Sequence, residues 1–168
     1  MIHNEDSRVK IPTILHLTRL GYTYLSVKNA QWDESTNVFT DIFNTSIHQI
    51  NPQLNTDEVK RYYNQLSLIL ENEDLGKAFY EKLTAKSGIK LIDFENFHNN
   101  TFHVVTELPF KKDDEVFRPD ITLLINGMPL AFIEVKKPNN LNGIQDEKNR
   151  LATRFQNKKF RKFFNITQ

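Results

Sequence analysis

The sequence predicts an α/β domain in which a small mixed β-sheet is flanked by helices and preceded by an N-terminal helical segment. Apolar residues recur at helical spacing through the first half and at strand spacing through much of the second. A chain of 168 residues with 39% hydrophobic and 26% charged residues can bury one good core. We therefore expect a single domain over residues 1–168, mainly helical over 1–88, with the sheet and a basic helix over 89–168.

Four segments of the first half have the apolar periodicity of amphipathic helices: 6–22, 37–50, 55–72 and 74–88. The first begins with an Asp or Ser cap and stops at Gly21, and the last ends at Gly88. The third opens with Asn or Thr followed by acids, as helix N-termini do. Between these helices, residues 23–27 are a possible strand, and residues 89–94 are either a strand or a connector.

Three segments of the second half are rich in β-branched and aromatic residues and have strand length: 100–108, 117–125 and 129–137. Helical composition returns over 142–163. Residues 163–168, "FFNITQ", resemble the start of another strand. An apolar element cut at its beginning suggests that the chain is the N-terminal piece of a longer protein.

The stretch "RPDITLLINGMPLAFIEVKK", residues 118–137, reads as a hairpin around Asn126-Gly127, which we place at the centre of the sheet. Each strand has one wholly apolar face, because side chains alternate between the two faces of a strand. The opposite faces carry Asp120 on the first strand and Glu134 with Lys136 on the second. Whether these charged faces coincide depends on the register.

A one-residue change of register exchanges the two faces of a strand. A two-residue loop would put Asp120 opposite Ile133, on the wrong side. A three-residue loop with Gly127 left-handed would pair Leu124 with Met128 and put Asp120 opposite Phe132. Glu134 would then lie diagonally close, roughly 5–8 Å away. We predict this odd-length loop or an equivalent bulge.

Two carboxylates held together repel, and the pKa of each rises unless a cation lies between them. Mg²⁺ takes oxygen ligands and keeps several waters, so Asp120 and Glu134 are predicted to be its ligands. Lys136, on the face of Glu134, could orient or activate the attacking water and stabilise negative charge on a phosphate. These parts suit hydrolysis of a phosphodiester.

Pro119-Asp120, one hairpin, and then Glu134-Val135-Lys136 resemble the signature of the PD-(D/E)XK nucleases. With "HLTRLGYTYLSVK" early in the chain and "RFQNKKFRKFFNITQ" at its end, the sequence resembles the N-terminal nuclease domain of the restriction (R) subunit of type I restriction-modification enzymes. The resemblance implies a restriction-endonuclease-like core and a catalytic set of Asp120, Glu134 and Lys136. It also implies Mg²⁺-dependent cutting of double-stranded DNA, together with methyltransferase and specificity subunits and an ATP-driven motor further along the chain.

The sequence departs from this family in the helix after the catalytic strand. Many members carry a Gln followed four residues later by Tyr, whereas the candidate positions here hold Arg150, Arg154 and Phe155. This auxiliary motif is therefore not carried over. Whether Glu5 or a Gln of the basic helix joins the site is left open.

Positive charge is concentrated at the end of the chain, where residues 138–168 hold seven Lys or Arg against two acids. Several of these basic residues follow one stripe of the predicted helix, and we expect them to contact DNA: Arg150, Arg154, Lys158, Lys159 and Arg161. Such binding would be largely independent of sequence and would weaken steeply with salt. A solvated helix face explains the same run equally well.

Several classes of protein are excluded or disfavoured. The absence of cysteine excludes Cys-ligated zinc, iron–sulfur clusters and thiol nucleophiles. No membrane-length apolar run or secretory signal occurs, so we expect a cytoplasmic protein without a membrane partner. No G-x-x-x-x-G-K-[ST] loop occurs, so any ATPase would lie beyond Gln168. Two alternatives remain: a repair or junction-resolving nuclease of the same superfamily, and a non-catalytic DNA-binding or docking module.

Overall fold

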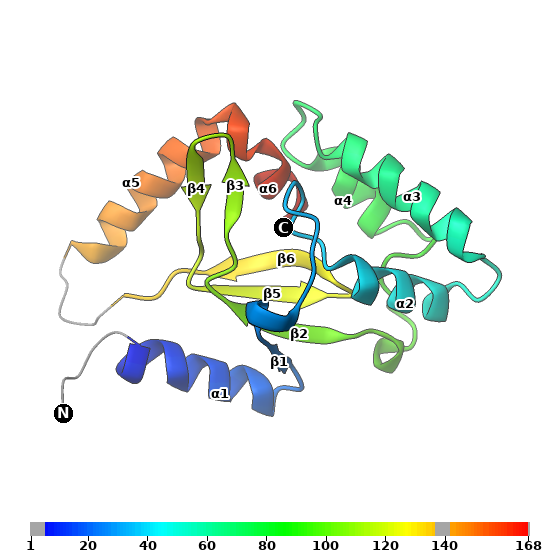
Figure 1. The fold of residues 1–168 in the computed structure, drawn as a ribbon, viewed down its shortest axis with the longest axis horizontal. Helices are drawn as coiled ribbons and strands as arrows, with labels where there is room; N and C mark the ends of the chain where they lie inside the picture. Colours follow the sequence, from blue (N-terminus) through cyan, green and yellow to red (C-terminus); the bar gives the residue numbers. More distant parts are fainter. Residues whose placement is uncertain (1–5, 137–141, 168) are drawn as a thin grey trace.

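A four-stranded mixed sheet forms the centre of the computed structural model, which describes residues 6–136 and 142–167 (Figure 1). Its strands lie in the order β1 (Thr23–Leu25), β2 (Phe102–Thr106), β5 (Ile121–Ile125) and β6 (Met128–Ile133). The β1–β2 pair is parallel and the other pairs are antiparallel. The predicted mixed sheet is thus confirmed, but the hairpin is not at its centre, because β6 is the last strand in this order.

The sheet is covered by helices on both faces: α1 (Ile11–Arg19), α2 (Thr40–Ile50), α3 (Thr56–Ile69), α4 (Lys77–Leu83), α5 (Gly143–Gln156) and α6 (Arg161–Ile166). A π-helical turn at Asp6–Lys10 leads into α1. Three short 3₁₀ turns lie at Val27–Asn29, Phe97–Asn99 and Lys158–Phe160. In Figure 1, α1 lies on one side of the sheet and α2, α3, α4 and α6 on the other. The layers are those of an α/β domain.

Both parts of the chain contribute to this sheet. From the predicted helical part, β1 pairs with β2, and Leu17 of α1 packs against Val104 and Ile121. The predicted helices of the first half are confirmed, although α4 ends at Leu83, before Gly88. The third, α3, has a complete capping box formed by Asn55 and Glu58.

Residues 89–94 form a connector, because side chains bind their backbone. The amide nitrogen of Asn51 donates to Lys90 O at 2.8 Å, and Lys90 N donates to Asn51 Oδ1 at 2.8 Å. Asn126 Nδ2 also donates to Leu91 O at 2.8 Å. Backbone groups that a neighbouring strand would bind are thus satisfied by buried amides.

The helix predicted over 142–163 is broken. It ends at Gln156, and Asn157 is extended, with φ −79° and ψ 114°. The side chain of Asn157 accepts a hydrogen bond from Lys159 N and so caps the following 3₁₀ turn. The predicted strand at 163–168 is wrong over its described residues, which belong mainly to α6.

The hairpin of β3 (Phe110–Lys112) and β4 (Glu115–Phe117) was not predicted, and it explains why the end of the chain is helical. Phe110 and Phe117 form a buried cluster with Phe160 and Phe163. Residues three apart lie on the same face of a helix, so the helical turn presents both C-terminal rings to the hairpin.

Across residues 6–136 and 142–167, no helix combines the length and the apolar character that a bilayer span requires.

Candidate active site at the end of the β5–β6 hairpin

The turn of the β5–β6 hairpin has two residues, so the predicted three-residue loop is wrong. Asn126 and Gly127 both have positive φ, 51° and 79°, and Ile125 pairs with Met128. This is the backbone of a type I′ turn, which favours Asn-Gly. The buried Asn126 side chain holds the turn, since its Oδ1 accepts from Thr101 N at 2.8 Å.

A β-bulge in the hairpin then restores the charged register, as the alternative prediction required. Leu124 pairs with Pro129 and Leu123 pairs with Ala131, which leaves Leu130 as an extra residue in β6. Proline has no N–H to give to a ladder and is accepted at bulges and on edge strands, and Pro129 is at both.

The bulge determines where the two acids lie. Beyond it, Thr122 pairs with Phe132 and Ile121 with Ile133. One further step of the same register puts Asp120 directly opposite Glu134, on the face of Thr122 and Phe132. The predicted meeting of these acids is confirmed, but their relation is directly cross-strand and not diagonal.

The two carboxyl groups share a half-buried position. Asp120 Oδ2 accepts a hydrogen bond from Val135 N at 2.9 Å, and Asp120 Oδ1 is 3.7 Å from Lys10 Nζ. The pKa of Glu134 is raised to about 7, first by burial and then by the negative charge of Asp120 and a hydrogen bond with Asp120. The positive charges of Lys136 and Arg154 oppose this rise in pKa.

The third predicted site residue, Lys136, follows the end of β6 and is outside the strand ladder. Its Nζ is 3.1 Å from Glu147 Oε2, and its side chain is 23% exposed. Its charge also acts on Glu134. The structure thus brings Asp120 and Glu134 into contact, while the amine of Lys136 lies nearby in an ion pair with α5.

Three charged residues near this site were not predicted. Lys10 Nζ is 2.9 Å from Glu107 Oε1 and joins that acid to Asp120. Glu107 has a positive φ of 53°, and its N–H donates to Asp120 O at 3.1 Å. Glu147, a residue of α5, is buried. Its position three residues before Arg150 in a predicted helix indicates an ion pair between the two side chains. Nothing local in the sequence indicates that Lys10 pairs with acids about a hundred residues away.

The donor set suits a hard divalent cation with few protein ligands. Within the described residues there is no group of three or more His, Asp or Glu side chains that could hold a metal ion. The pair of Asp120 and Glu134 offers carboxylate oxygens, and burial followed by the negative charge of Asp120 raises the pKa of Glu134. Mg²⁺ is bound in this way, through one or two carboxylates and retained waters. Glu5 lies outside the described residues.

The residues predicted to bind DNA do not form one helical stripe, because the helix breaks at Asn157. Arg150 and Arg154, on α5, both pair with Glu147. Lys158, Lys159 and Arg161 lie beyond the break. Lys159 Nζ is 2.7 Å from Asp114 Oδ1 and 3.0 Å from Glu115 Oε1. The role of all five in DNA binding stays a prediction.

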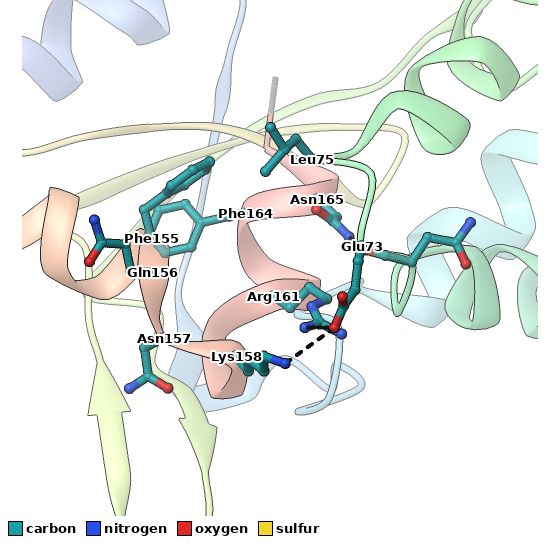
Figure 2. Close-up of a pocket in the computed structure, with 10 residues that line it drawn as sticks. Glu73, Leu75, Phe155, Gln156, Asn157, Lys158, Arg161, Phe164 and Asn165 are labelled. Carbon is teal, nitrogen blue, oxygen red and sulfur yellow. Dashed lines mark hydrogen bonds and ion pairs between the residues drawn. The ribbon is translucent and has the colours of Figure 1, made fainter.

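A surface hollow with a volume of about 210 Å³ lies at this break, and Figure 2 shows the side chains that line it. It is lined by Asn72, Glu73, Leu75, Phe155, Gln156, Asn157, Lys158, Arg161, Phe164 and Asn165. Arg161 Nη2 lies 2.6 Å and Lys158 Nζ 3.5 Å from Glu73 Oε1 (Figure 2). None of the residues predicted to be catalytic lines this hollow, so it is separate from the candidate site.

Fold and site together define a mixed α/β domain with paired carboxylates at the end of a bulged hairpin. The chain belongs to the family described as the N terminus of the type I restriction enzyme R protein, whose model matches residues 2–168. It is 32% identical over 160 residues to a Methanocaldococcus jannaschii protein named as the type I restriction enzyme MjaIXP endonuclease subunit, with 80% of this chain covered. It is 26% identical over 150 residues to the type I restriction enzyme HindI endonuclease subunit of Haemophilus influenzae, with 75% covered.

These alignments cover 15% and 14% of the length of the two relatives. A shorter alignment, 47% identical over 55 residues, covers 33% of this chain and 5% of the MjaVIIP endonuclease subunit of M. jannaschii.

Proposed function

We propose that this chain is the Mg²⁺-dependent endonuclease domain of a type I restriction enzyme R subunit, with a PD-(D/E)XK core. The observation that carries the proposal is the bulged hairpin, which puts Asp120 opposite Glu134 where an unbulged two-residue hairpin would have separated them. The names of the relatives, which are endonuclease subunits, support the same conclusion.

In this proposal Asp120 and Glu134 hold the cation through their carboxylate oxygens. Bound Mg²⁺ would supply Lewis-acid activation of the phosphate and lower the pKa of water. Val135 N fixes the orientation of Asp120 through its hydrogen bond to Oδ2. Glu134 must lose its proton before it can act as a ligand, because its pKa is raised to about 7.

Lys136 acts on the other reactants. Its ammonium orients the attacking water and stabilises the negative charge that develops on the phosphate. The water oxygen bonds to phosphorus and gives up a proton to solvent, while the bond from phosphorus to the bridging oxygen of the leaving strand breaks and that oxygen takes up a proton. No covalent enzyme intermediate forms.

The wider assembly is part of the same proposal. Double-stranded DNA is the substrate, and methyltransferase and specificity subunits are the partners that would select the target. ATP would be used by a motor segment outside these residues. We place this assembly in the cytoplasm.

The test is Mg²⁺-dependent cleavage of double-stranded DNA by the full-length protein assembled with those subunits. Asp120→Ala and Glu134→Ala should each abolish cleavage while ATP hydrolysis by the complex continues. If both variants cut DNA like the unmodified complex, the proposal is wrong. If Asp120→Ala also leaves Mg²⁺ binding unaltered, a non-catalytic docking role is favoured.

A further inference from the structure

Glu147 is the most deeply buried ionisable side chain near the candidate site. It lies on α5 with 5% of its surface exposed. Three cations surround its carboxylate: Lys136 Nζ at 3.1 Å, Arg154 Nη1 at 3.7 Å, and the guanidinium of Arg150. A buried carboxylate is tolerated only when such partners compensate for its lost hydration.

The three cations come from two different places in the fold. Arg150 and Arg154 are on α5 itself, one turn and two turns after Glu147. Lys136 comes from the segment after β6, two residues beyond Glu134. Glu147 is therefore the point at which α5 is joined to the proposed catalytic hairpin by charge.

Arg154 is itself held in place. Its guanidinium carbon lies 4.4 Å from the centroid of the Phe117 ring. Phe117 belongs to the buried phenylalanine cluster between the β3–β4 hairpin and α6. A guanidinium placed over an aromatic ring is attracted to it electrostatically, and this favours the observed position of Arg154. A continuous set of contacts thus runs from that cluster through Arg154 and Glu147 to Lys136.

We infer that Glu147 is a positioning residue for Lys136, with Arg150 and Arg154 holding the carboxylate in place. The inference rests on the proposed function, in which Lys136 acts on water and phosphate. A lysine amine at the end of a four-carbon stem samples many positions unless an acceptor fixes it. Small displacements of a catalytic group have large effects on rate, and supporting contacts prevent them.

This role differs from that of an ion pair that only stabilises the fold. A positioning residue acts through Lys136, so its loss should have no further effect once Lys136 is gone. It should lower kcat and leave the dependence on Mg²⁺ concentration unchanged, because Asp120 and Glu134 keep their places. A structural ion pair would instead act independently of Lys136.

The experiment is a double-mutant cycle in the full-length, assembled protein. Glu147→Gln should lower kcat about 10–100-fold, the range typical of groups that support a catalytic residue. Lys136→Ala should lower it further, and Lys136→Ala with Glu147→Gln should be no slower than Lys136→Ala alone. Asp146→Asn, which removes the same charge from an exposed neighbour on α5, is the matched control and should behave like the unmodified protein.

A second measurement is independent of activity. The rate at which acetic anhydride labels Lys136 in metal-free protein, followed by mass spectrometry, should rise in Glu147→Gln and stay unchanged in Asp146→Asn. If Glu147→Gln does not fold, Glu147→Asp takes its place, because aspartate keeps the charge and only shortens the side chain. It should also label faster at Lys136 and should lose activity.

Glu147→Gln with normal kcat and normal labelling would overturn the inference, as would effects of Glu147→Gln and Lys136→Ala on kcat that simply multiply. These outcomes are distinct from failure of the proposed function. If the proposed function is wrong, Asp120→Ala and Glu134→Ala leave cleavage intact, whatever the effect of Glu147→Gln.

Discussion

Two charged regions of the molecule contain similar residues in very different surroundings. At the end of the hairpin, the cations meet Glu147, whose side chain is 6% exposed. Beyond Asn157, the cations meet acids on the surface, and the side chains of Glu73 and Asp114 are 67% and 86% exposed. A buried carboxylate fixes its partners because it cannot return to water, whereas exposed pairs are worth little and exchange readily.

Buried and exposed ion pairs suit different tasks. Fixed geometry suits a group that acts on a reacting phosphate. Exchangeable pairs suit contacts in which a DNA phosphate replaces a surface carboxylate. The sequence run of basic residues 150–161 is divided at Asn157. We propose that the part before it supports the site and the part after it contacts DNA.

The largest expected effect is on the rate of DNA cleavage. Lys136→Ala should lower kcat by about 10²–10⁴-fold, because it removes a group that acts in the transition state. Lys148→Ala, which removes an exposed lysine of α5, is the control and should leave kcat unchanged. If Lys136→Ala cuts DNA at the normal rate, Lys136 and its ion pair with Glu147 do not contribute to catalysis.

The next effect is on the free energy of unfolding, and it comes from the Asn126-Gly127 turn of the β5–β6 hairpin. A Cβ at Gly127 would lie 2.7 Å from Phe39 O and 2.7 Å from Phe43 N, at a φ of +79°. Gly127→Ala should lower the free energy of unfolding by about 2–4 kcal/mol, from left-handed strain and overpacking combined. Gly88→Ala, with φ +83° and nothing within 4 Å, isolates the strain and should cost about 1–2 kcal/mol in urea denaturation. Equal losses in the two variants would show that the packing of the turn on α2 contributes nothing.

A smaller effect concerns pH. The pKa of Glu134 is raised from 4.5 to about 7, so the metal-free folded protein binds a proton there that the unfolded chain has released. Stability therefore falls as pH rises from about 4.5 to about 7. Mg²⁺ must displace this proton, and its affinity should fall about tenfold per pH unit below 7.

Calorimetric titration at pH 6 and pH 8 would measure the change in Mg²⁺ affinity. Glu134→Gln should raise the thermal midpoint of the metal-free protein at pH 8 and abolish the stabilisation by Mg²⁺. A lower midpoint in this variant would contradict the raised pKa.

The smallest expected effect is on DNA affinity. Arg161→Ala should reduce the slope of log affinity against log salt by about 1, as expected for one lost phosphate contact. Glu73→Gln, which frees Arg161 and Lys158 from their partner, should instead raise affinity at low salt. An unchanged slope in Arg161→Ala together with an unchanged affinity in Glu73→Gln would show that these residues do not contact DNA.

Local pattern was sufficient for the four helices of the first half and the three main strands, because each has its own periodicity, but not for the end of the chain, where the predicted helix breaks at Asn157 and α6 replaces a predicted strand. Asn55 and Glu58, for example, form the predicted helix start. The site was predictable as far as the pairing of Asp120 with Glu134, since only a register change could place two acids of apolar strands on one face. The form of that register change was not predictable, because Asn-Gly fits a two-residue turn and no strong local pattern indicates the bulge at Pro129.

What the sequence could not show depends on contacts between distant segments. The end of the chain, where a strand was predicted at 163–168, is helical in α6, and Phe163 of this helix packs against Phe110 and Phe117 of the β3–β4 hairpin, far earlier in the chain. The pairing of Lys136 with Glu147 crosses residues 137–141, and that of Lys10 with Asp120 crosses most of the chain. Tertiary packing decides such cases against local propensity.

Anomalous diffraction from crystals soaked in Mn²⁺ tests most directly whether Asp120 and Glu134 share a divalent cation, because Mn²⁺ binds oxygen ligands as Mg²⁺ does. The account predicts a peak between the carboxylates of Asp120 and Glu134, about 2–2.3 Å from an oxygen of each, and its loss in Glu134→Gln crystals. Ordered density for both side chains with no peak between them, or a peak held by other residues alone, would contradict it.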